Sequence, residues 1–84
     1  MGRSINWKVV AHATLHGTQM EILEGLAKQD RLSPVQFHGE GRGLGRVVYH
    51  FRTLRKAGLL EAAGTAQRRG TTEHFYRLAK RVTR

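Results

Sequence analysis

The sequence contains no cysteine, so a disulfide framework and a thiolate metal site are both excluded. It also lacks any apolar run near the roughly 20 residues that cross a bilayer. The N-terminus has no apolar core of the kind that a signal peptide carries. These absences predict a soluble, cytoplasmic protein with no membrane segment, whose stability comes from packing alone.

Acidic residues are scarce, and the imbalance of charge is concentrated in one half of the chain. The 84 residues include 15 Lys and Arg against 6 Asp and Glu, for a net charge of +9. Residues 1–42 hold five basic and four acidic side chains, whereas residues 43–84 hold ten and two. A chain of this length forms one domain, 1–84, and a nucleic acid is the commonest partner of so basic a surface. A membrane surface is a weaker candidate, because the apolar helix faces are needed for the core.

The N-terminal part, residues 5–28, has helical patterning. Residues 6–13 predict a first helix, although the pair Val9-Val10 also suits a short strand. Thr18 and Glu21 have the spacing of a capping box, and the helix that follows is expected to end near Lys28. Gly17 either separates two helices or lies within one.

Residues 33–57 predict a helix-turn-helix. Ser33-Pro34-Val35-Gln36 combines a capping residue, a proline suited to the first helical position and a glutamine that completes a capping box. Glycines at positions 39, 41, 43 and 45 then require a turn. They do not indicate a phosphate loop, because no Gly-Lys-Ser/Thr follows and no apolar strand precedes them. A second helix is expected from about Leu44 to Ala57, closed by Gly58.

Helical phase divides this second helix into two faces. Leu44, Val47, Phe51 and Leu54 share the face expected to be in the core. The opposite face is basic and carries an aromatic side chain; its members are Gly45, Tyr49, Arg52 and Lys56, flanked by Arg46 and Thr53.

Residues 59–79 predict a β-hairpin, with strands at 59–65 and 72–79 joined by the polar segment Gln67-Arg68-Arg69-Gly70. Residues 80–84 are expected to be a frayed basic tail. The order of the elements predicts an α+β fold of the winged helix-turn-helix type, with three to four helices and a C-terminal two-stranded β-hairpin as the wing.

Two segments resemble ArsR-type winged helix-turn-helix regulators. The segment Val47-Val48-Tyr49-His50-Phe51-Arg52-Thr53-Leu54-Arg55-Lys56-Ala57-Gly58-Leu59-Leu60 is similar to that family's recognition helix, and Arg68-Arg69-Gly70-Thr71-Thr72-Glu73-His74-Phe75-Tyr76-Arg77-Leu78 is similar to its wing. The resemblance spans about residues 12–79. It implies a DNA-binding transcriptional regulator that represses by occupying its operator, and a homodimer formed through residues 5–16.

The predicted partner is double-stranded DNA, and the location is then cytoplasmic, at the nucleoid. Arginine can donate two hydrogen bonds to guanine in the major groove, and inserted arginines suit a narrow minor groove. The residues expected to contact DNA are Arg46, Tyr49, Arg52, Thr53 and Lys56 on the recognition helix, Arg68 and Arg69 in the 67–71 wing, and Arg42, Arg77 and Lys80 on phosphates.

Enzymatic and metal chemistry have little support. The chain has no nucleophile with an obvious base and no paired carboxylates, and no cofactor or small-molecule substrate is evident. His12 and His16 have the i, i+4 spacing of metal ligands, but two ligands do not make a site. His50 and His74 are expected to be structural. Two competing hypotheses remain: a protein-interaction module that uses the same fold, and an architectural or RNA-binding protein without sequence specificity.

Overall fold

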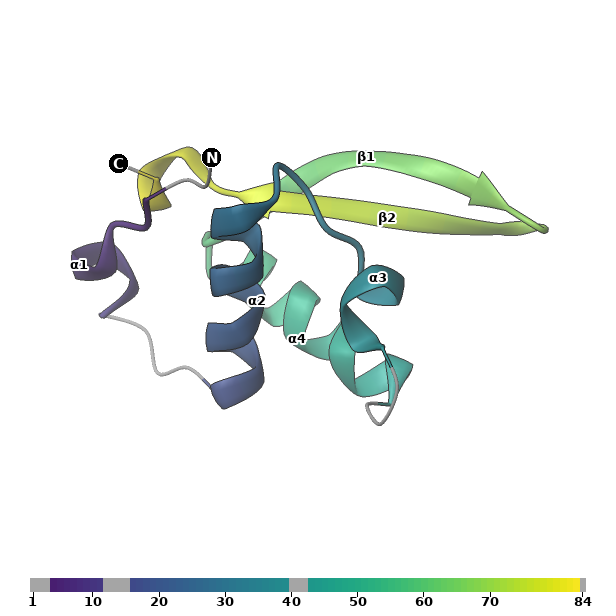
Figure 1. Ribbon diagram of the computed structural model, residues 1–84, viewed down its shortest axis with the longest axis horizontal. Coiled ribbons are helices and arrows are strands. Elements are labelled where there is room, and N and C mark those ends of the chain that lie inside the picture. The colour runs from purple at the N-terminus through teal and green to yellow at the C-terminus, as the bar shows by residue number, and fades with distance from the viewer. Residues whose placement is uncertain (1–3, 12–15, 40–42, 84) are drawn as a thin grey trace.

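The computed structural model describes residues 4–11, 16–39 and 43–83 and has an α+β fold (Figure 1). In these ranges the elements are the α-helices α1 (Trp7–Val10), α2 (Gly17–Lys28), α3 (Pro34–His38) and α4 (Leu44–Lys56), the strands β1 (Leu60–Arg68) and β2 (Thr71–Leu78), and a 3-10 helix, η1 (Lys80–Val82). The helices pack together at one end, and the antiparallel hairpin extends beyond them (Figure 1).

The N-terminal segment confirms helix over strand for the part that is described. Asn6 caps α1, and its side-chain oxygen accepts the backbone N–H of Lys8 at 3.2 Å. Residues 12 and 13, which complete the predicted range, lie outside the described residues.

The cap predicted for α2 is wrong. His16 caps the helix: its Nδ1 accepts the N–H of Thr18 at 3.0 Å, and the side-chain oxygen of Gln19 accepts the N–H of His16 at 3.1 Å. An unprotonated imidazole nitrogen can accept a hydrogen bond as a serine oxygen does, so the helix begins at Gly17, earlier than a cap at Thr18 requires. Its end at Lys28 agrees with the prediction.

The predicted start of α3 and the predicted end of α4 are both confirmed. Ser33 Oγ accepts the N–H of Gln36, and the Gln36 side chain accepts the N–H of Ser33, both at 3.2 Å. After α4, Gly58 has φ +80°, and the N–H of Leu59 reaches back to the carbonyl of Leu54 at 3.0 Å. This left-handed glycine followed by a buried leucine is a Schellman motif, which satisfies carbonyls left free at the helix end.

One member of the predicted core face of α4 is misplaced. Leu44 is 41% exposed, while His50 is buried beside Val47, Phe51 and Leu54. The physical reason is that Leu44 is the first residue of α4, so its side chain lies at the end of the helix and outside the core cluster. The polar ring of His50 is accommodated in the interior because its Nδ1 is hydrogen-bonded to Gln19 Nε2 at 3.0 Å.

The hairpin is present, with a tighter turn than predicted. Arg68 pairs with Thr71, so only Arg69 and Gly70 form the turn, and both have positive φ, at 45° and 82°. Positive φ at both positions is typical of a type I′ turn, which matches the twist of the strands. The register shifts between Ala62 and Thr65, where Gly64 has φ +104°.

A backbone bridge joins the segment between α2 and α3 to the sheet. Leu32, between α2 and α3, exchanges both backbone hydrogen bonds with Tyr76 of β2 at 2.9 Å. Nothing in the sequence pattern predicts this bridge.

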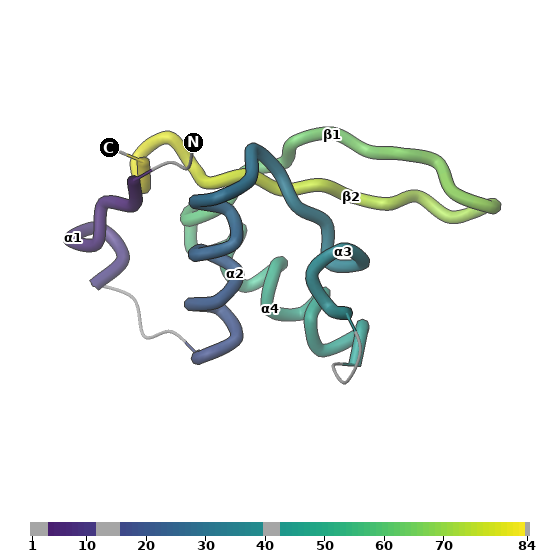
Figure 2. The backbone as a smooth tube through the Cα atoms, viewed as in Figure 1, coloured from purple at the N-terminus to yellow at the C-terminus, as the bar shows by residue number. Residues whose placement is uncertain are grey.

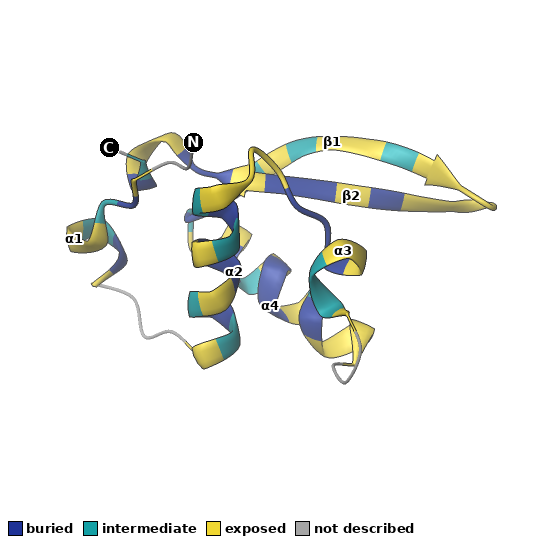
Figure 3. Ribbon diagram, viewed as in Figure 1, coloured by how far each residue is buried: buried dark blue, intermediate teal, exposed yellow. Residues whose placement is uncertain are grey.

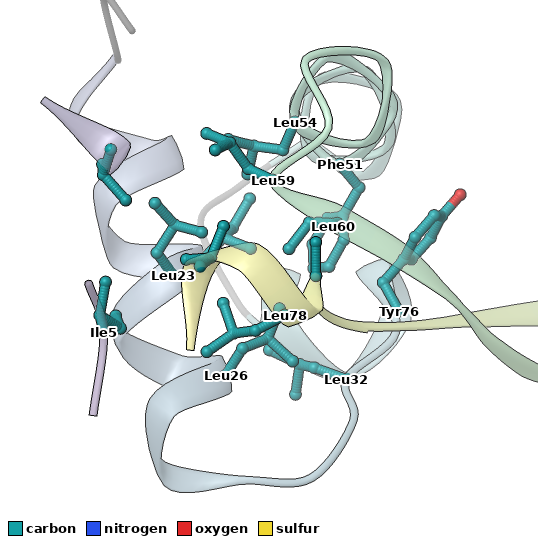
Figure 4. Packing of buried hydrophobic residues seen from close by; sticks show 14 of the residues in the cluster. Ile5, Leu23, Leu26, Leu32, Phe51, Leu54, Leu59, Leu60, Tyr76 and Leu78 are labelled. Carbon is teal, nitrogen blue, oxygen red and sulfur yellow. The ribbon is translucent and has the colours of Figure 1, made fainter. Parts of the chain in front are cut away.

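The core lies where α2, α4 and the base of the hairpin meet (Figure 4). Leu23 and Leu26 of α2 face Phe51 and Leu54 of α4, with Leu78 of β2 between the two helices. Buried residues line the inward helix faces, the segments that adjoin them and β2 as far out as Glu73, and the tip of the hairpin is exposed (Figure 3).

The predicted frayed tail is wrong for residues 80–83; residue 84 lies outside the described residues. Val82 is fully buried, its carbonyl accepts the N–H of Asn6 at 2.6 Å, and Thr83 bridges Ile5. The two ends of the chain therefore run side by side (Figure 2). The physical reason is tertiary: η1 and α1 cover each other's apolar side chains, which neither could bury alone.

Candidate nucleic-acid interface

The outward face of α4 carries the predicted recognition residues together. Arg46, Arg52 and Lys56 are exposed, and Tyr49 is 63% exposed. Thr53 is half-buried, and its hydroxyl donates to the carbonyl of Tyr49 at 2.9 Å. This bond occupies the only proton of the Thr53 hydroxyl, so in this arrangement Thr53 can offer a ligand only an acceptor.

A groove of about 410 Å³ lies between α4 and the hairpin. We call it the basic groove; its lining residues are Arg52, Arg55 and Lys56 of α4 with His74 and Tyr76 of β2. Arg55 and His74 were not among the predicted contacts. Helical phase puts Arg55 toward the core side of α4, and only the path of the hairpin leaves that flank open. The sequence predicts a structural role for His74, but its side chain is exposed on this groove.

A second hollow, of about 280 Å³, continues from the basic groove toward the start of α4. We call it the apolar hollow, because Pro34, Val35, Leu44 and Val48 contribute much of its lining. It shares Arg52, His74 and Tyr76 with the basic groove, and its remaining lining residues are Thr71, Thr72 and Glu73. The outward face of α4, the groove and the hollow thus form one continuous surface.

The two predicted wing arginines differ in their surroundings. Arg69 is exposed at the turn, and within the described residues its side chain has no hydrogen bond or ion pair. Arg68 instead donates from Nε to Glu73 at 2.7 Å. Arg69 is therefore the cation that the hairpin presents freely.

Glu73 connects the hairpin to α3. Its carboxylate, buried on β2, accepts the hydroxyl proton of Ser33 at the start of α3 as well as the bond from Arg68. The hydrogen bond from Ser33 and then the bond and charge of Arg68 lower the pKa of Glu73, against the opposing effect of desolvation. The ionised carboxylate thus fixes the hairpin relative to the helices that flank the apolar hollow.

The predicted phosphate contacts are not gathered on this surface. Arg42 lies outside the described residues. Arg77 points to the face of β2 opposite His74 and donates to Glu61 at 2.8 Å. That bond is the main cause of a lowered pKa of Glu61, and Lys80 acts in the same direction through its backbone N–H and its charge. Arg77 and Lys80 therefore share a separate hollow with Glu61 at the base of the hairpin.

His50 has the structural position expected of it. The His16 ring stacks on it with centroids 4.7 Å apart, and Gln19 joins the two by bonding His50 and the backbone of His16. Burial, followed by the charges of His16 and Arg46, lowers the pKa of His50 from its ordinary value. The neutral ring therefore holds the start of α2 against α4.

Metal and membrane features can be assessed only where the chain is described. In residues 4–11, 16–39 and 43–83, no group of three or more His, Cys, Asp or Glu side chains could hold a metal ion. His12, one of the two histidines with metal-ligand spacing, is outside these ranges. Over the same stretches, no helix has the length and apolar character needed to traverse a bilayer.

The surface built by α4 and the hairpin thus combines free cations, an exposed aromatic ring and an apolar hollow. The cations Arg46, Arg52, Arg55 and Lys56 have no side-chain hydrogen bond or ion pair with any described residue. No protein-family model, curated protein or solved structure matches this chain.

Proposed function

We propose that the protein is a sequence-specific, double-stranded DNA-binding transcriptional regulator with a winged helix-turn-helix fold of the ArsR type. The observation that carries the proposal is a set of cations on the exposed side of one helix that have no hydrogen bond or ion pair with any described residue: Arg46, Arg52, Arg55 and Lys56. Cations that gather on the exposed face of one helix are the electrostatic footprint of a nucleic-acid site.

In this proposal α3 and α4 are the helix-turn-helix, and α4 lies in the major groove. The N-terminal residues of a recognition helix contact base edges, which assigns Arg46 and Tyr49 to bases. Arg52 and Thr53 follow one turn later, where Arg52 can pair with guanine in a bidentate manner. Arg55 and Lys56, near the end of α4 and in the basic groove, are assigned to phosphates.

The hairpin is the wing of this proposal. It carries Arg69 at its tip, in reach of the minor groove or of the adjoining backbone. Arg68 contributes there once its bond to Glu73 is exchanged for a phosphate. Arg42, Arg77 and Lys80 are proposed to contact phosphates further out, and residues 5–16, which include the 42% exposed Trp7, to form a homodimer. Repression by occupying an operator near the nucleoid is the mode that the family resemblance implies.

The test is selection of bound sequences from a randomised duplex pool at about 150 mM salt, which weakens bulk phosphate attraction. We expect an enriched motif, and a palindromic one if the protein is a dimer. The variant R46Q/R52Q is expected to lose the enrichment, whereas K28Q/Q29E, with the same charge change at the exposed end of α2, is expected to keep it.

Two other results would contradict the proposal. Retention of the pool without enrichment, matched by equal binding of RNA, would indicate an architectural or RNA-binding protein. No retention at all would indicate a protein-interaction module.

A further inference from the structure

The apolar hollow is an unusual neighbour for a surface of arginines. Val35 is 51% exposed and Leu44 is 41% exposed, and both line it together with Pro34 and Val48. Single exposed aliphatic side chains are ordinary on protein surfaces. A contiguous apolar patch with a polar rim is instead typical of a surface that binds a ligand or a partner.

The position of the hollow along α4 indicates which kind of partner it contacts. Leu44 is the first residue of the helix, Val48 follows four residues later, and Arg52 four residues after that. Residues at this spacing lie in a row on one flank of a helix. The row therefore changes from apolar to cationic along α4, with its apolar end at the helix N-terminus, where a recognition helix meets base edges.

We propose that the apolar hollow contacts thymine C5-methyl groups in the major groove of duplex DNA. This inference rests on the proposed function, because it requires α4 to enter that groove. Thymine is the only common base that presents a methyl group there, and apolar side chains are its usual contacts. Arg52 at the rim of the hollow matches the phosphate or guanine beside such a thymine.

The two ends of the row differ in what they can contact. Leu44, at the apolar end, can contact a methyl group, and Arg52, at the cationic end, can contact a phosphate or a guanine. Leu44 and Val35 are exposed and belong to different helices, so the hollow that they border can admit a methyl group between α3 and α4. Uracil lacks that methyl group, so the same contact favours DNA over RNA.

The test uses the duplex selected from the randomised pool, with each thymine replaced singly by deoxyuridine. One or two replacements are expected to weaken binding about fourfold each, the loss expected for one buried methyl group. The remaining replacements are expected to change affinity less than about twofold.

A variant then links the effect to the hollow. Leu44→Ala is expected to bind the thymine duplex more weakly and to lose its preference for thymine over uracil at the sensitive position. Val35→Ala is a second probe from α3, and both side chains are exposed, so the fold should survive. Met20→Ala, on α2 and not among the residues that line the hollow, is the control that keeps the preference.

Two results would overturn the inference in distinguishable ways. If the wild type enriches a motif yet tolerates deoxyuridine at every position, the thymine contact is wrong while the proposed function stands, and a protein segment becomes the better occupant. If the wild type enriches no motif, the proposed function fails and this inference fails with it.

Discussion

The arginines and lysines of α4 differ from those of the hairpin and the C-terminal segment in what surrounds them. Arg52, Arg55 and Lys56 extend into the basic groove and have no hydrogen bond or ion pair with a described residue. Arg77 is bound to Glu61, and Arg81 donates to the carbonyls of Gly58 and Ala57, both at 3.0 Å. A basic residue can therefore serve the fold or be free for a ligand, and net charge alone does not distinguish the two.

Arg31 extends the contrast to the middle of the hairpin. Its guanidinium donates to the carbonyl of Ala63 at 3.2 Å and lies 4.0 Å from the centre of the Phe75 ring. It thereby covers the irregular pairing around Gly64, where Nη1 would lie 3.2 Å from an added Cβ. This arginine stabilises the sheet, and we do not assign it to DNA.

The largest expected effect is a loss of affinity for DNA when two arginines of the basic groove are replaced. It distinguishes the contacts of these side chains from the effect of net charge. R52Q/R55Q is expected to lower affinity for the selected duplex about 100-fold, since each residue contributes on the order of 1–3 kcal/mol to a base or phosphate contact. The slope of log affinity against log salt is expected to become shallower by about 1, because Arg55 alone of the two is assigned to a phosphate. Fluorescence anisotropy over a range of salt concentrations measures both, with K28Q/Q29E as the equal-charge control. An equal loss in the control would show that only net charge matters.

The next variant breaks the hydrogen bonds of Ser33 and Glu73 that fix the hairpin against α3. Ser33→Ala removes the cap of α3 and one donor to Glu73, so the free energy of unfolding is expected to fall by about 1–2 kcal/mol. Urea unfolding followed by circular dichroism is the measurement. Thr18→Ala is the control, because Thr18 does not cap α2 and its replacement is expected to change stability by less than about 0.5 kcal/mol. Equal losses in the two variants would contradict the assignment of the cap.

A smaller effect is expected for the cation that serves the end of α4. Arg81→Gln removes two bonds to terminal carbonyls and a positive charge beside the helix C-terminus, which is expected to cost about 1 kcal/mol of stability. Its affinity for the selected duplex is expected to stay within about threefold of the wild type. Lys28→Gln, which removes a positive charge from the last turn of α2, tests whether charge alone produces the loss of stability. A stable Arg81→Gln variant that binds DNA poorly would move Arg81 into the interface.

The smallest expected effect is a dependence of stability on pH. Because the pKa of His50 is lowered in the folded state, the unfolded chain binds a proton first as the pH falls below about 6.5. The free energy of unfolding should therefore fall as the pH decreases from about 6.5 toward the pKa of His50 in the folded state. Above a pH of about 6.5, the contribution of His50 should stay constant. His50→Gln, which can still bond Gln19, is expected to flatten that part of the profile, measured as Tm against pH.

The matched variant for this profile is His74→Gln, at an exposed histidine on β2, which is expected to retain the wild-type dependence. The lowered pKa of Glu73 adds a separate loss further down: its contribution is complete above the ordinary glutamate pKa and disappears as the pH falls through the folded value. An unchanged profile in His50→Gln would contradict the role given to His50.

Local chemistry explains which parts of the fold were predictable. The start of α3 follows from Ser33, Pro34 and Gln36, and the end of α4 follows from Gly58, because caps are determined by neighbouring residues. The hairpin follows from its strand-like composition and from the polar segment Gln67-Arg68-Arg69-Gly70, but the two-residue turn within that segment does not. The cap of α2 was missed because it uses a histidine, which is outside the usual set of capping residues.

The remaining features depend on contacts between distant segments. The bridge between Leu32 and Tyr76, and the docking of Val82 beside Asn6, join residues far apart in sequence. The same holds for the candidate site: helical phase places Tyr49 and Arg52 outward, but only the path of the hairpin exposes Arg55. Sequence patterns could locate the basic helix, but they could not show which flank of it lies open.

The most direct test of the central claim is to map the DNA-binding surface by NMR, titrating the isotope-labelled protein with the selected duplex. The account predicts that amide shifts concentrate in residues 44–56 and in residues 68–74 of the hairpin, with those of α1 nearly unchanged. Shifts that concentrate instead around Trp7 and the outer face of α2, with α4 unaffected, would contradict it.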